Sequence, residues 1–264
     1  MKITVFTSNQ NRHNYLINSL SKICEELFVV QECKTVFPGI IPGHYPANNT
    51  MKKYFQNVVA AELNLFGNSF VNKYNKNIKI LPIQFSDLDK CSMNFLNDFI
   101  KSDYYIVFGS SYIKGELVDF LVDNKAINIH MGVSPYYRGT DCNFWALYDN
   151  NPHLVGATIH LLSKGLDSGP ILYHAMSNVI TNSFEYSMST VKSAFDSLAE
   201  RINDNSIFNM KTELQDKSKE IRYSRKDEFN ENEVEEFFKK KIKLNTKMFN
   251  NSLLQKPFFL KNKN

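Results

Sequence analysis

Short apolar runs alternate with amphipathic stretches along the first two hundred residues of this chain, and this alternation most constrains its fold. The runs are rich in β-branched and aromatic residues and are bounded by polar or turn residues, which is typical of strands. Five such runs lie at 3–6, 27–30, 78–81, 104–108 and 127–130, and helical patterns lie at 15–24, 51–65, 93–100 and 115–122. The alternation predicts βαβ units and therefore an α/β fold, a mostly parallel twisted sheet flanked by helices.

The chain continues in the same style beyond the fifth run. A helix is predicted after Gly139, with Thr140 or Asp141 as its N-cap, and two more strands are predicted at 155–162 and 171–175. A long amphipathic helix is expected at 183–202. The proline- and glycine-rich stretch 37–46 predicts a loop; His44 and Tyr45 in it either close over a ligand or belong to an ordinary surface connection.

The character of the sequence changes after about residue 205. Residues 231–243 are strongly charged, and residues 256–264 mix proline, phenylalanine and lysine without a period. We therefore expect a domain of residues 1–205, followed by a short C-terminal appendage, 206–264, that is partly ordered at best. Phe258, Phe259 and Leu260 in this appendage suggest a contact within a homodimer.

Charge and apolar patterning restrict the class of protein. The formal net charge of +4 permits an anionic substrate without requiring nucleic acid. The lysine run that begins at Lys239 stands beside acidic residues, which is typical of a solvated helix face rather than an RNA-binding patch. No apolar stretch approaches the roughly 20 residues that span a bilayer, and the residues from Met1 to Phe6 resemble a first strand more than a signal peptide. We expect a cytoplasmic protein that does not insert into a membrane.

The cysteines also indicate a reducing compartment. They are far apart in the sequence and contain no Cys-x-x-Cys pair, so reduced thiols are expected rather than disulfides or a zinc site. The four are Cys24, Cys33, Cys91 and Cys142.

Three polar residues near the ends of predicted strands form the candidate catalytic group. Asn128 and His130 are two residues apart in one strand, so both side chains point to the same face of the sheet. Asp167 follows in a turn bounded by glycines, which let the backbone approach a ligand. An amide, an imidazole and a carboxylate can together stabilise an oxyanion, move a proton and orient the proton carrier, which acyl transfer requires.

Each of these residues has a structural explanation when it is taken alone. An asparagine and a histidine at a strand end commonly make structural hydrogen bonds, and an aspartate between glycines is a common turn residue. On a βαβ scaffold, and within the wider motif that surrounds them, the three together favour a catalytic site.

The wider motif resembles that of the folate-dependent formyltransferases, and the sugar N-formyltransferase branch most closely. It comprises Asn128-Ile129-His130, then Pro135-Tyr136-Tyr137-Arg138-Gly139, and then Gly165-Leu166-Asp167-Ser168-Gly169. The resemblance is strongest from about residue 104 to 172 and implies a Rossmann-like formyltransferase fold. It implies N10-formyltetrahydrofolate as formyl donor and no metal.

The resemblance also implies roles for residues. Asn128 and His130 would donate hydrogen bonds to the developing oxyanion, and Asp167 would orient His130 and keep its proton available for the departing N10 atom. The pterin would be held largely by backbone groups in two segments. The residues concerned are Ser110, Ser111, Tyr112, Ile113, Leu162, Lys164 and Gly165.

The chain departs from the family pattern at three positions. Met131-Gly132 stands where the family usually has Pro-Ser, a change that could widen or reshape the pocket, and Ser134 replaces an apolar residue. None of these changes removes a reacting group, so they bear on the substrate more than on the chemistry.

The acceptor amine is inferred from what the chain lacks. The 59 residues after residue 205 are too few for the C-terminal domain that methionyl-tRNA formyltransferases carry. The glycine-rich phosphate loop of the glycinamide ribonucleotide enzymes is missing after the first strand, and the pattern begins at Met1 without the N-terminal regulatory domain expected of the family's deformylases. A nucleotide-linked amino sugar, such as a 4-amino-4,6-dideoxyhexose for the O-antigen of a lipopolysaccharide, fits best. The first βα turn is a ready anion site for its pyrophosphate. The expected substrate-binding residues are Ser8, Asn9, Arg12, His13, Tyr136, Tyr137 and Arg138.

Other readings remain open at this point. Arg12 and His13 are equally compatible with solvated residues at a helix start. Trp145 is a candidate for lining the pocket but is also compatible with core packing. A formyltransferase acting on another amine, including methionyl-tRNA, would share the same motif. A non-catalytic folate- or nucleotide-binding module on the same fold is a further alternative. A metal hydrolase is disfavoured, because the histidines show no ligand spacing such as His-x-x-x-His.

Overall fold

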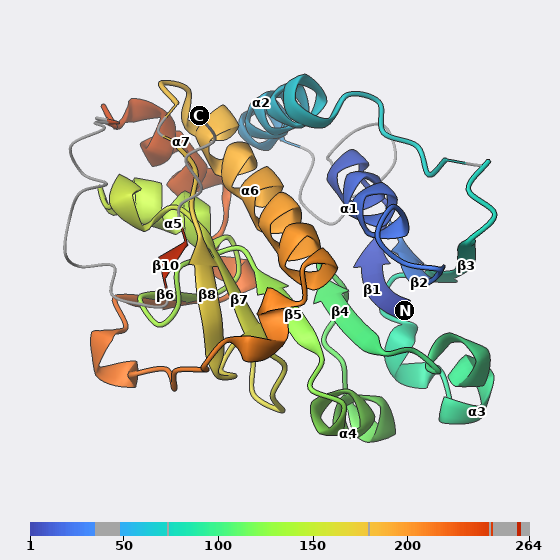
Figure 1. Ribbon diagram of the computed structural model, residues 1–264. Helices are drawn as coiled ribbons and strands as arrows, with labels where there is room; N and C mark the ends of the chain where they lie inside the picture. Colours follow the sequence, from blue (N-terminus) through green and yellow to red (C-terminus); the bar gives the residue numbers. More distant parts are fainter. Residues whose placement is uncertain (35–47, 73, 179, 243, 245–257, 260–264) are drawn as a thin grey trace.

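The computed structural model describes residues 1–34, 48–72, 74–178, 180–242, 244 and 258–259 (Figure 1). The expectations for His44, Tyr45 and Leu260 lie outside these residues, as do those for the side chains of Phe258 and Phe259.

The central sheet has eight described strands in the order β10-β8-β7-β5-β4-β1-β2-β3 (Figure 1). Every neighbouring pair is parallel except those that β7 makes with β5 and β8, so β7 alone runs against the others. The strand order reverses between β1 and β4, which is where ligands of such sheets bind. The strands are β1 (Lys2–Ser8), β2 (Glu26–Cys33), β3 (Ile78–Gln84), β4 (Tyr104–Phe108), β5 (Ile127–His130), β7 (Ala157–Leu161), β8 (Ile171–Ala175) and β10 (Phe258–Phe259).

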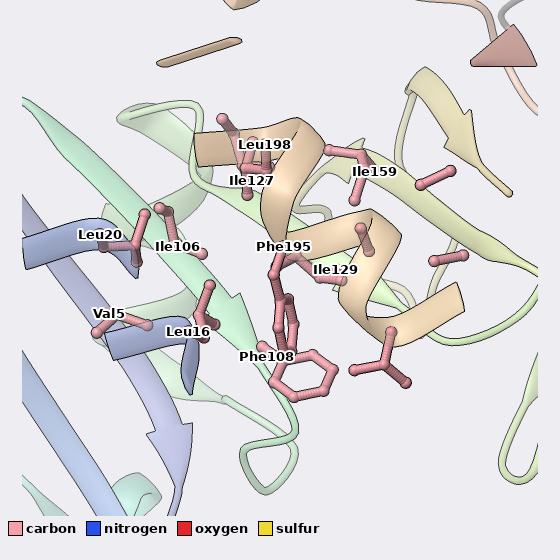
Figure 2. Close-up of a cluster of buried hydrophobic side chains, with 14 of the residues drawn as sticks. Val5, Leu16, Leu20, Ile106, Phe108, Ile127, Ile129, Ile159, Phe195 and Leu198 are labelled. Atoms are coloured by element: carbon pink, nitrogen blue, oxygen red, sulfur yellow. The ribbon is translucent and has the colours of Figure 1, made fainter. Parts of the chain in front are cut away.

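One face of the sheet is covered by α1 (Asn11–Ser21), α2 (Asn49–Phe66) and α6 (Ser183–Asn203). The long helix α6 packs against β7, β8 and the other two helices (Figure 1). Its Phe195 ring lies edge-on to Phe108 of β4, with ring centroids 4.8 Å apart, among aliphatic side chains of the strands (Figure 2). The opposite face is covered by α3 (Met93–Leu96) and α4 (Gly115–Asp123), whose apolar side chains form a separate cluster.

A second structural region lies beyond β5. It consists of α5 (Cys142–Tyr148), α7 (Glu231–Lys239) and a small parallel sheet of β6 (Tyr137–Gly139) and β9 (Arg222–Ser224). Its rings gather around Tyr54 of α2, including Phe144, Phe229 and Phe237. Short 3-10 turns complete the described chain at Leu88–Lys90, Asn97–Phe99, Pro152–Leu154, Ser206–Asn209, Lys217–Lys219 and Lys226–Glu228.

The expected α/β architecture is confirmed, and the strand at 104–108 and the two that start at 127 and 171 have the expected bounds. Two helices differ. The first begins at Asn11 rather than at residue 15, because the carboxylate of Glu62 accepts the backbone N–H of Arg12 and satisfies its first turn. The expected helix at 93–100 has only one α-turn before it tightens into a 3-10 turn.

Residues 206–242, the described part of the expected appendage, pack onto the domain. The segment contributes β9 to the small sheet, and α7 packs on α2 with Val234 and Phe237 buried. Its order comes from long-range packing onto the domain. The local composition does not show this packing, because exposed acidic and lysine residues surround the two apolar anchors.

Candidate active site

The carboxyl end of β5 carries the first two residues of the candidate catalytic group. Asn128 and His130 point to the same face of the strand, and His130 is buried. The antiparallel register places Asn128 directly opposite His160 of β7, and His130 opposite Thr158. Two strands therefore determine the positions of these side chains, and no loop intervenes.

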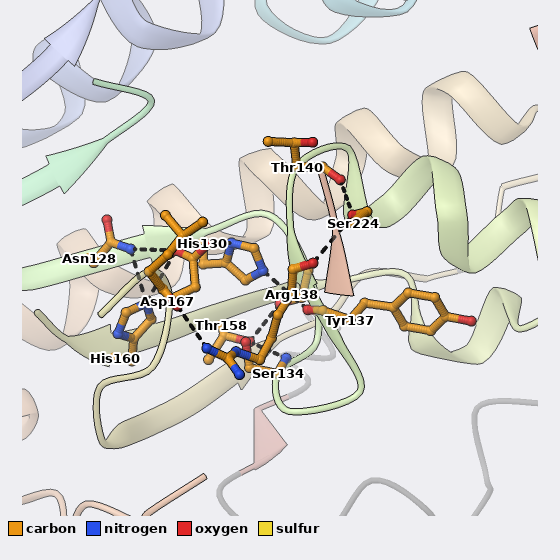
Figure 3. A network of polar contacts seen from close by, with 12 residues as sticks. Asn128, His130, Ser134, Tyr137, Arg138, Thr140, Thr158, His160, Asp167 and Ser224 are labelled. Atoms are coloured by element: carbon orange, nitrogen blue, oxygen red, sulfur yellow. Dashed lines mark hydrogen bonds and ion pairs between the residues drawn. The ribbon is translucent and has the colours of Figure 1, made fainter. Parts of the chain in front are cut away.

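Asp167 reaches the pair from the connection between β7 and β8 (Figure 3). Its Oδ2 lies 3.3 Å from His130 Nδ1, and its Oδ1 accepts the Asn128 amide at 3.3 Å. The residue has φ of +46°, and its side chain is 11% exposed. The neighbouring Gly169 is required, because a Cβ there would lie 1.8 Å from the carbonyl oxygen of Leu161. The structure thus brings together the three residues that the sequence singled out.

His160 is a fourth member of this group that sequence reasoning missed. Its Nδ1 bonds the carbonyl of Leu161 at 2.8 Å, so this nitrogen carries the hydrogen and Nε2 accepts from the Asn128 amide at 3.0 Å. Burial lowers the pKa of His160 to about 4, so the ring is neutral near pH 7. The period-2 pattern of β7 could have shown that His160 points to the same face as Thr158.

These contacts hold the Asn128 amide in one orientation, with its nitrogen towards His160 and Asp167. His130 stands between two acceptors, since Nδ1 faces the Asp167 carboxylate and Nε2 lies 3.2 Å from the carbonyl oxygen of Tyr137. A proton on either imidazole nitrogen therefore has a bonding partner, which suits a group that must carry and release a proton.

Gly132 lies between His130 and Cys142. A Cβ at this position would be 2.6 Å from both His130 Nε2 and Cys142 Cβ. The glycine of the Met131-Gly132 departure therefore does not widen the pocket, because Cys142 occupies the space that a larger residue would take. Ser134 is fully buried, and its backbone bonds Thr158 and His174.

The two segments expected to hold a pterin lie side by side. The hydroxyl of Tyr112, after β4, donates to the carbonyl of Lys164, after β7, at 2.8 Å. Tyr112 is half exposed, whereas Ile113 and Leu162 belong to the apolar cluster under α4.

The remaining members of these segments are mostly engaged within the protein. Ser111 bonds the buried Glu32 through its backbone N–H and its hydroxyl, and the Ser110 hydroxyl bonds a neighbouring carbonyl. Lys164 pairs with Asp119 at the surface. No Cβ fits at Gly165 without displacing the side chain of Ser168. Backbone groups are therefore the main candidates for holding a planar ring here.

A cavity of about 270 Å³ lies near the catalytic group, and none of Asn128, His130 and Asp167 lines it. Met131 and Cys142, which flank the catalytic His130 region, form one end of its lining. Most of the remaining wall is apolar and comes from α2, α5, α6 and α7, and its apolar residues include Phe55, Val58, Phe144, Leu147, Phe184, Met188, Val191 and Phe237.

Two charged side chains line this cavity. Arg12 pairs with Glu62 at 3.0 Å, and the Glu62 side chain is only 3% exposed. Asp141 lies at the start of α5 with φ of +54°. The pKa of the Tyr54 hydroxyl is raised by burial and then by Asp141, and that of the Cys142 thiol is raised well above its usual value by burial, Asp167 and Asp141. Asp141 therefore lies close to both of these groups.

Four of the expected substrate-binding side chains face the interior of the protein. Ser8 is fully buried and bonds the carbonyl of Glu32. His13 is 2% exposed and bonds Thr7, and burial lowers its pKa well below its usual value, so it carries no charge for an anion.

Tyr137 and Arg138 are likewise occupied. Tyr137 is buried and bonds Asp149 and Asn151 through its hydroxyl. Arg138 pairs with Glu220 and donates to the carbonyl of Leu166. Each of these four side chains therefore supports the fold through contacts within the protein.

The first βα turn is not an open anion site either. The Glu62 carboxylate already bonds the backbone N–H and the guanidinium of Arg12, so the helix end holds an anion from the protein itself. Asn9 accepts the backbone N–H of Lys34, and Tyr136 packs on the second structural region. Of the expected substrate residues, Arg12 alone lines the cavity.

Within the part of the chain that the structure describes, no group of three or more His, Cys, Asp and Glu side chains is arranged to hold a metal ion. No helix in the same described part is both long and apolar enough to cross a bilayer.

Solved structures share this fold. A 4-N formyltransferase from Francisella tularensis is similar with a TM-score of 0.52 and 21% identity, over 86% of this chain and 77% of that one. An N-formyltransferase from Helicobacter canadensis, in complex with folinic acid and dTDP-3-aminofucose, has a TM-score of 0.51 and 14% identity. The match covers 87% of this chain and 73% of that one. Glycinamide ribonucleotide transformylase 1 from Symbiobacterium toebii has a TM-score of 0.51 and 15% identity, over 82% of this chain and 94% of that one. At these identities the likeness shows the fold alone.

A family model also matches part of the chain. The model described as formyl transferase matches residues 98–202. The matched segment contains β4, β5 and β7 and the catalytic group of Asn128, His130 and Asp167. Over this segment the chain matches the formyl transferase family.

Proposed function

We propose that the protein transfers a formyl group from N10-formyltetrahydrofolate to the amino group of a nucleotide-linked amino sugar, for bacterial surface polysaccharides such as an O-antigen. The observation that carries the proposal is the assembled group of Asn128, His130 and Asp167 at the end of β5. The segments suited to a pterin meet at Tyr112 and Lys164, and a separate cavity is lined by Met131, the residue after His130. The segments suit the formyl donor and the cavity the acceptor.

The chemistry assigned to this group follows from its contacts. The acceptor amine adds to the formyl carbon, the bond from that carbon to N10 breaks, and a proton passes from the amine to N10. His130 donates to the developing oxyanion and carries the proton, while Asp167 orients its ring. Asn128 holds one amide hydrogen on His160 at 3.0 Å, and the hydrogen on Asp167, at 3.3 Å, is the one that a formyl oxygen takes over.

The cavity favours an amine on a largely apolar body. Its polar groups near the catalytic end include Asp141, whose carboxylate suits an ammonium group, and the rings of α2, α5 and α7 suit apolar faces such as that of a deoxy sugar. The one lining cation, Arg12, is neutralised by Glu62, so the cavity suits the sugar rather than the pyrophosphate. The nucleotide would remain outside it.

The test is a transfer assay with N10-formyltetrahydrofolate and a panel of nucleotide-linked 3-amino and 4-amino sugars. Tetrahydrofolate release is followed by absorbance, and the product by the mass gain of one formyl group. Asn128→Ala and His130→Ala should each lower kcat by roughly 100-fold or more, as the loss of an oxyanion donor or proton carrier does. Asn97→Ala, at an exposed position, serves as the matched control and should leave kcat unchanged.

The alternatives give different results in the same assay. Formylation of methionyl-tRNA instead of any sugar would overturn the proposed acceptor and keep the chemistry. Folate binding without transfer to any amine would indicate a binding module. The structural similarity to a glycinamide ribonucleotide transformylase is a reason to include that amine in the panel.

A further inference from the structure

The segment that follows α6 runs back past the connection between β7 and β8, which carries Asp167 (Figure 1). Glu213 pairs with Ile171 at the start of β8 through two backbone hydrogen bonds of 2.8 and 2.9 Å. The next residue, Leu214, is 85% exposed, and the one after it, Gln215, turns inward. The segment therefore aligns itself with β8 immediately before it reaches the Asp167 connection.

Gln215 makes two contacts with the backbone of that connection. Its Nε2 donates to the carbonyl of Asp167 and to the carbonyl of Gly169, each at 2.8 Å. Both hydrogens of the amide are thus used on carbonyl oxygens that flank one turn. Such a pair of bonds restrains the turn more than one bond would, because the planar amide fixes the separation of its two partners.

A second contact supports the same turn from the other side. Arg138 donates to the carbonyl of Leu166 at 2.9 Å and is itself held by Glu220 at 3.0 Å. Glu220 and Gln215 belong to the same segment, so three carbonyl groups of the connection, those of Leu166, Asp167 and Gly169, depend on it.

The Asp167 turn needs such support. Asp167 has φ of +46°, a conformation that is unfavourable for a residue with a Cβ. Its carboxylate must also remain near both His130 Nδ1 and the Asn128 amide, each at 3.3 Å. These contacts are long, so a small rotation of the turn would break them.

We propose that Gln215 is a positioning residue of the active site, which acts by fixing the backbone of the Asp167 turn. The inference rests on the proposed function for its kinetic consequence, but its structural consequence can be measured without activity. The residue lies outside the segment that matches the family model, in the part of the chain whose composition suggested a loose appendage.

The kinetic test compares Gln215→Glu and Gln215→Met with wild type. The first variant keeps the shape and loses both donors, and the second keeps the length and removes all hydrogen bonding. We expect kcat per folded enzyme to fall by roughly 10- to 100-fold, because displacements on the order of 1 Å in a site have such effects. The KM values should change less than kcat. Leu214→Ala, one residue away and exposed, is the matched control and should equal wild type.

The pH dependence separates positioning from a loss of folding. A carboxylate between two carbonyl oxygens is repelled, whereas its protonated form has one hydrogen to donate. The activity of Gln215→Glu relative to wild type should therefore rise as the pH is lowered from 8 to 5.5. A variant that merely unfolds more easily would show no such recovery, and Gln215→Met should show none.

A second readout is the side-chain amide of Asn128, observed by ¹⁵N NMR. Its signals should shift or broaden in Gln215→Met and remain in place in Leu214→Ala, because the Asn128 nitrogen donates to the Asp167 carboxylate. Unchanged Asn128 signals together with a kcat within twofold of wild type would overturn the proposal. Shifted signals in a protein that formylates no amine would support the positioning role and overturn the proposed function.

Discussion

Replacement of His160 by phenylalanine should weaken both folding and catalysis, since one ring joins a strand carbonyl to the catalytic amide. Its Nδ1–H bonds the Leu161 carbonyl at 2.8 Å, and its Nε2 accepts from Asn128 at 3.0 Å. His160→Phe keeps the ring in place and leaves these two partners without their bonds in a buried site. Each lost partner costs about 1–3 kcal/mol, so the free energy of unfolding should fall by about 2–6 kcal/mol at pH 7.

The same substitution should change how stability depends on pH. Burial lowers the pKa of His160 from 6.5 to about 4, so the folded protein binds fewer protons than the unfolded chain between these values. His160 therefore contributes to the free energy of unfolding, and this contribution is fully present above pH 6.5 and is lost as the pH falls towards 4. It amounts to about 3 kcal/mol. His160→Phe lacks this group, so it should lose correspondingly less stability than wild type over that range.

The assay is equilibrium urea unfolding at pH 7.0, 6.0 and 5.0, with formyl transfer measured on the same preparations. His153→Phe is the matched control, because His153 is only partly buried and lies in the 3-10 turn Pro152–Leu154, outside β7. We expect kcat of His160→Phe to fall about tenfold or more, as the amide of Asn128 loses its orienting acceptor. Parallel stability curves for wild type and His160→Phe would refute the reasoning that His160 is held neutral.

Three further results are expected. Phe237→Ala should lower the free energy of unfolding by about 3–5 kcal/mol in urea titrations, because a buried ring is removed from the aromatic cluster; a loss below 1 kcal/mol would mean that α7 is not part of the core. Glu62→Gln should cost about 3 kcal/mol by the same method, since it leaves Arg12 without its charge partner, and an unchanged midpoint would contradict that pairing. Asp141→Asn should raise the KM for the acceptor amine about tenfold while the KM for the folate donor stays constant; equal KM values for the amine would remove Asp141 from the acceptor site.

The sequence predicted the parts of the structure that follow local rules. The strands at 104–108 and 127–130 could be placed because period, composition and turn residues agree there. Asn128 and His130 could be assigned to one face from their spacing alone. The family resemblance then added Asp167, which no local rule would place beside them.

Contacts between distant residues account for what the sequence did not show. The carboxylate that occupies the start of α1 belongs to Glu62, 50 positions along the chain, so an apparently open anion site is filled. His13 and Arg138 look like charged surface residues and are instead buried with partners of their own. Such pairings depend on the tertiary fold, and no periodicity along the chain encodes them.

The antiparallel pairing of β5 with β7 has a consequence for how this protein can vary. Asn128 and His160 face each other across that ladder, so their contact exists only in one alignment of the two strands. A single residue inserted within β7 would turn His160 to the other face of the sheet. β7 should therefore tolerate few substitutions and no insertion, although this five-residue strand holds none of Asn128, His130 and Asp167.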